Sequence, residues 1–158
     1  MIHERSASYD DGVVTAMKFV IPTAFSPESQ LCEMALLAEQ NGIDAIAISD
    51  HVAHPETIAS PYPYTKDGAI RWTEDTAWPD PWVAIGAMAA VTARLRFLTN
   101  VYVLALRNPF LAAKQIATAA ALSADRVALG VGVGWCAEEF ELAGQDFKSR
   151  GRRTDEMI

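Results

Sequence analysis

Residues 43–51 read IDAIAISDH, a mostly apolar run that is closed by three polar side chains. Strands that are buried on both faces read this way, without regular polar alternation, and they occur in parallel sheets covered by helices. Three further runs have the same character: KFVIP at 18–22, LRFLTNVYVL at 95–104 and RVALGVGV at 126–133. We therefore predict four parallel strands, with Asp50 and His51 at the carboxyl end of the second.

Helix signals stand between these runs. Ser26-Pro27 predicts a helix start, because a capping hydroxyl precedes proline at the first helical position, and Asn41-Gly42 predicts the end of that helix. Asp80-Pro81 and Asn108-Pro109 predict two more helix starts by the same rule. Shorter helical segments are expected at 138–142 and 149–158. Strand and helix thus alternate four times, which is the pattern of the α/β class.

Two architectures fit four such units: an open doubly wound sheet, or half of an eight-stranded barrel. In both, ligands bind beyond the carboxyl ends of the strands. A closed (β/α)8 barrel typically takes about 250 residues. The 158 residues of this chain correspond to part of one.

The composition predicts one globular domain, since 51% of the residues are hydrophobic. A net charge of −7 and a pI near 4.9 argue against nucleic acid or an anionic membrane as a partner. Cys32 and Cys136 stand in unrelated contexts and predict reduced thiols, so we expect a cytoplasmic protein.

Residues 1–16 are polar and lack the apolar core of a secretory signal. We predict that they form a disordered or non-native extension and that the domain covers 17–158.

Asp50 and His51 are the first candidates for chemistry, because they follow the second strand directly. A neutral imidazole there can bond a bound heterocycle and carry a proton, and Asp50 can hold its tautomer or contact the ligand. The alternative is a capped strand end with no chemical role. His54 extends the pair to Asp-His-x-x-His, which leaves a metal hydrolase as a minor alternative. Since no second His pair or Cys cluster completes a ligand set, we predict no metal.

Glycines at 130, 132 and 134 recur at every second position, which places them on one face of a continuous strand. Repeated glycine marks a place where another group comes close. The missing side chains leave room for a flat ring, or else allow tight backbone packing. The spacing differs from the GxGxxG dinucleotide motif, and no P-loop sequence occurs, so neither kind of nucleotide site is expected.

Thr99 and Asn100 form a polar pair inside the third apolar run. Buried polar groups need partners, so this pair bonds either neighbouring backbone or a ligand. Cys136 has no histidine of known proximity beside it and is interpreted as incidental.

Four segments together resemble the luciferase-like monooxygenase superfamily, and in particular its coenzyme F420-dependent oxidoreductase branch. They are AISDHV at 47–52, the Asp80-Pro81 helix start, ARLRFLTNVYVLALRNP at 93–109, and DRVALGVGVGWCAEEFELAGQDFKSRGRRTDEMI at 125–158. The resemblance covers residues 17–158. It implies a TIM barrel that holds a flavin-type ring at its C-terminal mouth, with this chain matching the N-terminal half.

The resemblance also implies roles for individual residues. Asp50 and His51 would contact the ring and assist proton transfer. The strand bulge behind the ring, often with a non-proline cis peptide, matches Asn100-Val101 and follows Thr99. The end of the fourth strand, Gly130 to Gly134, would lie beside the ring.

For the activity, the resemblance implies an oxidoreductase that acts on a small organic substrate. The motif style, with SDHV and RGRRTDE, favours hydride transfer by F420, and an FMN-dependent monooxygenase is the alternative. We expect a homo-oligomer. An alternative from another functional class is a half-barrel without catalytic activity, which is either a fragment or a module that assembles with a second chain.

Overall fold

The computed structural model describes residues 17–158, so the extension predicted for residues 1–16 lies outside the described residues. Four strands form a parallel sheet in the order β1-β2-β3-β5, and two more form a separate parallel pair, β4-β6. The strands are β1 (Val20–Pro22), β2 (Ala45–Ile48), β3 (Arg96–Thr99), β4 (Tyr102–Val103), β5 (Val127–Ala128) and β6 (Val131–Gly132). The α/β class and the parallel sheet predicted from the apolar runs are confirmed.

The helices follow the predicted order. They are α1 (Leu31–Gln40), α2 (Pro81–Ala90), α3 (Pro109–Leu122), α4 (Ala137–Leu142) and α5 (Arg150–Met157). Three short 3-10 turns accompany them: Glu28–Gln30, Leu104–Leu106 and Phe147–Ser149.

Local capping explains two of the helix starts. The Asp80 carboxylate accepts hydrogen bonds from the first free N–H groups of α2, and the Asn108 side chain does the same for α3. The predicted start at Ser26-Pro27 was wrong, because Ser26 makes no cap and Pro27 precedes a 3-10 turn before α1 begins at Leu31.

The third and fourth apolar runs each break into two strands, where we predicted one continuous strand apiece. In the third run the peptide between Asn100 and Val101 is cis, and pairing resumes at Tyr102. In the fourth run the Gly130 N–H donates to the Thr99 hydroxyl, which donates in turn to the Gly130 carbonyl, at 2.9 and 2.8 Å. A side-chain hydroxyl thus replaces a backbone partner, and the ladder is interrupted there.

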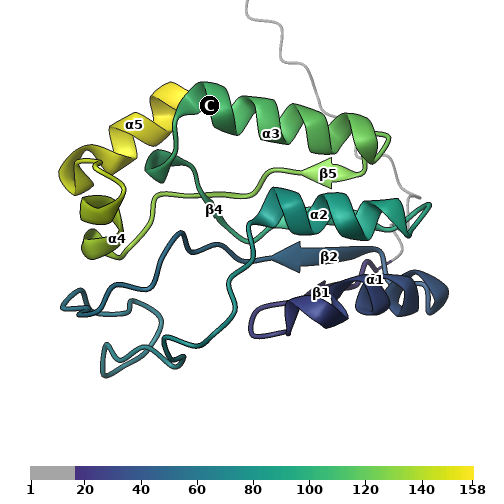
Figure 1. The fold of residues 1–158 in the computed structure, drawn as a ribbon, viewed down its shortest axis with the longest axis horizontal. Coiled ribbons are helices and arrows are strands. Elements are labelled where there is room, and N and C mark those ends of the chain that lie inside the picture. Colours follow the sequence, from purple (N-terminus) through teal and green to yellow (C-terminus); the bar gives the residue numbers. More distant parts are fainter. Residues whose placement is uncertain (1–16) are drawn as a thin grey trace, which may run out of the picture.

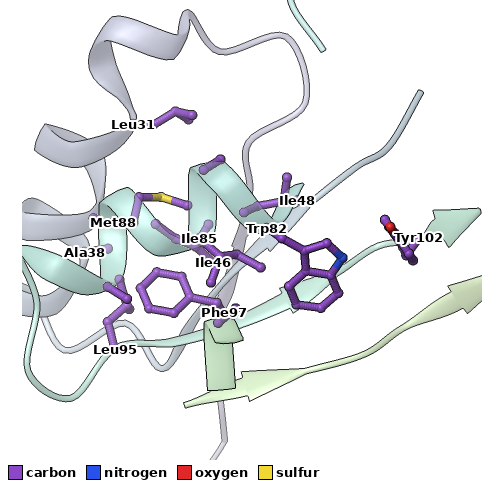
Figure 2. Packing of buried hydrophobic residues seen from close by; sticks show 14 of the residues in the cluster. Leu31, Ala38, Ile46, Ile48, Trp82, Ile85, Met88, Leu95, Phe97 and Tyr102 are labelled. Atoms are coloured by element: carbon purple, nitrogen blue, oxygen red, sulfur yellow. The ribbon is translucent and has the colours of Figure 1, made fainter. Parts of the chain in front are cut away.

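The main core lies between the sheet and α2 (Figure 2). Ile46 and Phe97 from the sheet pack with Ile85 and Met88 from α2, and all four side chains are fully buried. Burying an apolar side chain of this size contributes about 1.5–3 kcal/mol, so this contact stabilises the packing of α2 on the sheet.

The strands β2 and β5 point toward the same end of the molecule, where the long segment 49–80 and the helices α4 and α5 also lie (Figure 1). The sheet therefore presents its carboxyl ends to these three elements. Within 17–158, no helix combines the length and the apolar character needed to cross a membrane.

Candidate functional site

Asp50 ties the end of β2 to the chain that follows β4. Its side chain is fully buried, and both carboxylate oxygens face the Arg107 guanidinium, at 2.5 and 2.6 Å. The Val103 N–H donates to the same carboxylate at 2.8 Å. Burial raises the pKa of Asp50, while Arg107 and the Val103 N–H act in the opposite direction. Such a two-point contact fixes the orientation of the carboxylate.

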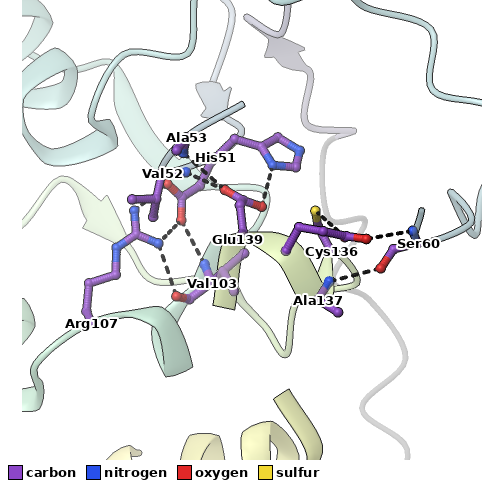
Figure 3. Close-up of polar contacts among 11 residues, drawn as sticks. His51, Val52, Ala53, Ser60, Val103, Arg107, Cys136, Ala137 and Glu139 are labelled. Atoms are coloured by element: carbon purple, nitrogen blue, oxygen red, sulfur yellow. Dashed lines mark hydrogen bonds and ion pairs between the residues drawn. The ribbon is translucent and has the colours of Figure 1, made fainter. Parts of the chain in front are cut away.

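His51 is held by a residue that sequence analysis did not single out. Its Nδ1 lies 2.9 Å from Oε2 of Glu139, whose side chain is 4% exposed (Figure 3). Because a carboxylate accepts hydrogen bonds, Nδ1 carries the proton in the neutral ring, and Nε2 keeps the lone pair. Asp50 is paired with Arg107, so the first of the two roles considered for it, holding the His51 tautomer, was wrong. Glu139 holds it.

Glu139 and its neighbour Glu138 also fasten the start of the long segment to α4. The second oxygen of Glu139 accepts from the Val52 and Ala53 N–H groups at 2.6 and 3.3 Å. Glu138 accepts from the Ala59 and Ser60 N–H groups at 2.8 and 3.0 Å. Burial alone would raise the pKa of Glu138, but the hydrogen bonds donated to it outweigh burial and lower the pKa to about 2. Residues 52–60 are therefore anchored by two consecutive carboxylates.

Three tryptophan rings surround the His51 imidazole. The ring centroids of Trp78, Trp72 and Trp135 lie 4.7, 5.3 and 6.0 Å from that of His51. The Tyr62 ring packs edge-to-face on Trp72 and Trp135 at 5.0 and 5.1 Å. Edge-to-face contacts at such distances are favourable arrangements of aromatic rings. Most of these rings come from the Tyr- and Pro-rich part of segment 49–80.

A cavity of about 640 Å³ opens among these groups. On the strand side it is bordered by Asn100, Val101, Gly132, Val133 and Gly134, and on the other sides by aromatic rings and the His51-Glu139 pair. Six of the candidate residues line it together: Asp50, His51, Asn100, Val101, Gly132 and Gly134. Thr99 and Gly130, which we also predicted to bind the cofactor, lie outside the lining and bond each other.

We had predicted that the three glycines share one strand face. They do not, because only Gly132 lies in a strand. A Cβ on Gly130 would overlap the Thr99 carbonyl oxygen, and one on Gly132 would overlap the Val101 side chain. Gly134 has a φ of +80°, a conformation that favours glycine. Tight backbone packing, the alternative weighed for these glycines, therefore accounts for the absent side chain at Gly130, whereas at Gly132 the close neighbour is the Val101 side chain.

Cys136 and the metal alternative find little support in the geometry. Burial raises the pKa of the Cys136 thiol to about 11, so at neutral pH it is protonated and a poor nucleophile. Among residues 17–158, no three His, Cys, Asp or Glu side chains gather closely enough to hold a metal ion. Of the hydrolase ligands considered (Asp50, His51 and His54), Asp50 is paired with Arg107, and His51 is bonded through Nδ1 to Glu139.

Comparison with known proteins agrees with this geometry. The family model described as luciferase-like monooxygenase matches residues 13–158. An uncharacterised protein of Mycobacterium tuberculosis is 39% identical over 142 residues, which cover 90% of this chain and 49% of that protein. An F420-dependent glucose-6-phosphate dehydrogenase of Amycolatopsis mediterranei is 33% identical over 138 residues, covering 85% of this chain and 36% of the enzyme.

Among solved structures, the fold resembles the oxygenating constituent of 3,6-diketocamphane monooxygenase from Pseudomonas putida, in complex with FMN. The TM-score is 0.67 at 20% identity, over 90% of this chain and 37% of that one. The chain spans at most about half the length of the curated relatives named above. Its parallel sheet and helices are those of a partial TIM barrel, one of the two architectures that the strand pattern left open and the one that the family resemblance implied. This chain belongs to the luciferase-like monooxygenase family.

Proposed function

We propose that this chain supplies part of the active site of an oxidoreductase that uses the deazaflavin F420 to move a hydride to or from a small organic substrate. The observation that carries the proposal is the setting of His51. Its Nδ1 is engaged by Glu139, and the ring lines the same cavity as the strand ends at Asn100-Val101 and Gly132. Working groups at the carboxyl ends of the strands are the rule in barrel enzymes.

The cavity fits the ring part of a flavin-type cofactor. Its volume of about 640 Å³ lies in the range of small-molecule sites, roughly 300–1,000 Å³. Asn100, Val101, Gly132 and Gly134 border it on the strand side and would hold the ring. When bound, the deazaflavin would supply the hydride chemistry, and the protein would supply orientation and electrostatics.

His51 would handle the proton that accompanies hydride transfer. Because Nδ1 donates to Glu139, Nε2 is the nitrogen that can take a proton from a substrate hydroxyl or return one. Within residues 17–158, the side-chain hydrogen bond of His51 is made through Nδ1. Asp50 would act by position, since it holds the strand end that carries His51.

The choice of F420 over FMN is supported by the relatives. Two of them, both about one third identical to this chain, are named F420-dependent glucose-6-phosphate dehydrogenase. The alternative is an FMN-dependent monooxygenase, supported by the fold shared with the diketocamphane enzyme. We further propose that residues 17–158 form the N-terminal part of the barrel domain. The competing hypothesis is that the chain is a half-barrel without catalytic activity.

A direct binding experiment separates these proposals. The purified chain is titrated with F420 and with FMN in separate experiments, following ring fluorescence, and each species is sized by light scattering. Saturable binding of F420 and weaker binding of FMN supports the proposal, and the reverse order supports the monooxygenase. If neither ring binds to any oligomer, the chain is not itself an active half-site.

A pair of variants tests the role of His51. We expect His51→Asn to retain F420 binding within a few-fold and to lose most of the turnover in a longer chain that is active. His54→Asn is the matched control, because His54 is outside the lining of the main cavity. Equal turnover in both variants would show that His51 has no catalytic role and is an ordinary loop residue.

A further inference from the structure

A single arginine, Arg150 at the start of α5, borders the cavity, and among residues 17–158 the lining contains no other arginine and no lysine. Its Nε donates to the Gly134 carbonyl oxygen at 3.1 Å, and its Nη1 donates to the Phe147 carbonyl oxygen at 2.9 Å. Its Cζ lies 3.8 Å from the centroid of the Phe147 ring, which also lines the cavity. Two carbonyl oxygens and one ring face therefore fix the orientation of the guanidinium beside Gly134.

The positive charge of Arg150 is not balanced by an acidic side chain. The ion pairs formed within residues 17–158 all join other groups, and the three partners of Arg150 are neutral. The two carboxylates of the lining have partners elsewhere, since Asp50 pairs with Arg107 and Glu139 accepts from His51. A guanidinium has five N–H donors and keeps its charge, and the hydrogen bonds described here use two of them. The other three remain for water or a ligand.

A second arginine of α5 shows what carbonyl bonding does by itself. Arg153 donates to the carbonyl oxygens of Ala105 and Arg107, at 3.0 and 2.8 Å, and it lies outside the cavity lining. These bonds fasten α5 to the chain that follows β4, so a structural role accounts for Arg153. Arg150 makes the same kind of bonds and borders the cavity as well. Its position, and not its hydrogen bonding, separates the two residues.

We propose that Arg150 forms an anion subsite of the cavity, which holds a carboxylate or phosphate group of a substrate. The planar guanidinium matches the paired oxygens of both groups. Aromatic rings such as Trp72 and Tyr62 line the same cavity and favour contact with a flat, apolar part of the same molecule. The assignment to a substrate rests on the proposed function, whereas the anion subsite does not. The phosphate of a bound cofactor is the other source of the same chemistry, and the titrations below separate the two.

Three probes with one ring system and different charge test the subsite. They are 1-naphthoate, 1-naphthylmethanol and 1-naphthylmethylammonium, each titrated into the purified chain at pH 7 by calorimetry. The naphthoate should bind at least about tenfold more tightly than the alcohol, and the ammonium should bind most weakly, because only the naphthoate finds an opposite charge. Raising the salt concentration should weaken binding of the naphthoate more than that of the alcohol. Naphthoate binding that is no tighter than alcohol binding overturns the proposal.

Variants assign this preference to Arg150. Arg150→Met should abolish the preference for naphthoate over the alcohol, and Arg150→Lys should keep only part of it, because lysine retains the charge without the planar fork. Arg153→Met is the matched control, since it removes the same charge and two carbonyl bonds of the same helix outside the cavity. It should keep the full preference. If Arg150→Met does not fold, Arg150→Lys and the three probes on the unmodified chain still decide. An unchanged preference in the folded Arg150 variants, or an equal loss in Arg153→Met, overturns the proposal.

A final set of titrations distinguishes a substrate anion from a cofactor phosphate. FMN is compared with riboflavin, and F420 with its phosphate-free ribityl deazaflavin, on the unmodified chain and on Arg150→Met. A substrate subsite predicts that the variant affects both members of each pair equally and that naphthoate still binds beside the saturating cofactor. A loss of about tenfold or more that is confined to the phosphorylated members overturns the assignment to a substrate. If no cofactor binds but the naphthoate preference depends on Arg150, the proposed function fails while the anion subsite stands.

Discussion

Replacing Arg107 by methionine should reduce the free energy of unfolding at pH 7 by about 3–5 kcal/mol, the usual loss when one partner of a buried ion pair is removed. The full value is expected here, because the Asp50 side chain is 0% exposed and that of Arg107 only 15%. The substitution also removes the bond from Arg107 to the Val103 carbonyl oxygen. Asp50 would then keep a single donor, the Val103 N–H.

Urea denaturation followed by circular dichroism measures this loss. With an m-value of about 2 kcal/mol per molar, a loss of 3–5 kcal/mol lowers the midpoint by about 1.5–2.5 M. Arg71→Met is the control: its ion pair with Asp67 is more than half exposed on both sides, so its midpoint should stay unchanged within error.

The pH dependence provides a second check. Burial raises the pKa of Asp50, and without Arg107 nothing but one N–H opposes that rise. A raised carboxyl pKa makes the folded state relatively more stable at low pH and less stable as the pH climbs through the folded value. The deficit of Arg107→Met should therefore be largest at neutral pH and shrink as Asp50 becomes protonated in both proteins. A deficit below about 1 kcal/mol, or one that grows on acidification, would refute this account of the pair.

Three further outcomes are expected. The pKa of Glu39 is lowered to about 2 by three backbone N–H donors, so Glu39→Gln should lower the thermal midpoint at pH 7, and the gap should close as the pH falls toward 2. Gly130→Ala should cost about 1–3 kcal/mol in urea denaturation because its Cβ overlaps a backbone carbonyl, whereas Gly86→Ala, with open space around it inside α2, should stabilise by about 0.5–1 kcal/mol. Glu139→Gln should alter the tautomer balance of His51 in long-range ¹H–¹⁵N spectra, and an unchanged spectrum would show that Glu139 does not set it.

The elements that local chemistry decides were predictable. Asp80-Pro81 and Asn108-Pro109 each combine a capping side chain with a proline that suits the first helical turn, and α2 and α3 begin there. Apolar runs without alternation led to the parallel sheet for an equally local reason. The start predicted at Ser26-Pro27 shows the limit, since the same signal produced a 3-10 turn before α1.

The parts that sequence reasoning missed depend on contacts between distant residues. Glu139 is 88 positions from His51 and lies in the segment 138–142, which was predicted only as a short helix. Arg107 directly precedes the helix start predicted at Asn108-Pro109, but its partner Asp50 is 57 positions away in the sequence. The break in the fourth run likewise follows from a hydroxyl on a neighbouring strand, Thr99. One available signal was topology, because the carboxyl ends of parallel strands meet at one edge.

The two carboxylates of α4 divide the long segment into parts with different freedom to change. Residues 52–60 are bonded to Glu138 and Glu139, so an insertion there would shift the support of His51. Residues 61–78 contribute rings, and their replacement leaves those bonds in place. Residues 61–78 can thus be replaced while the hydrogen bonds of residues 52–60 to Glu138 and Glu139 are kept. Under the function proposed above, a change of these rings would alter the surface that a substrate meets and would leave the support of His51 in place.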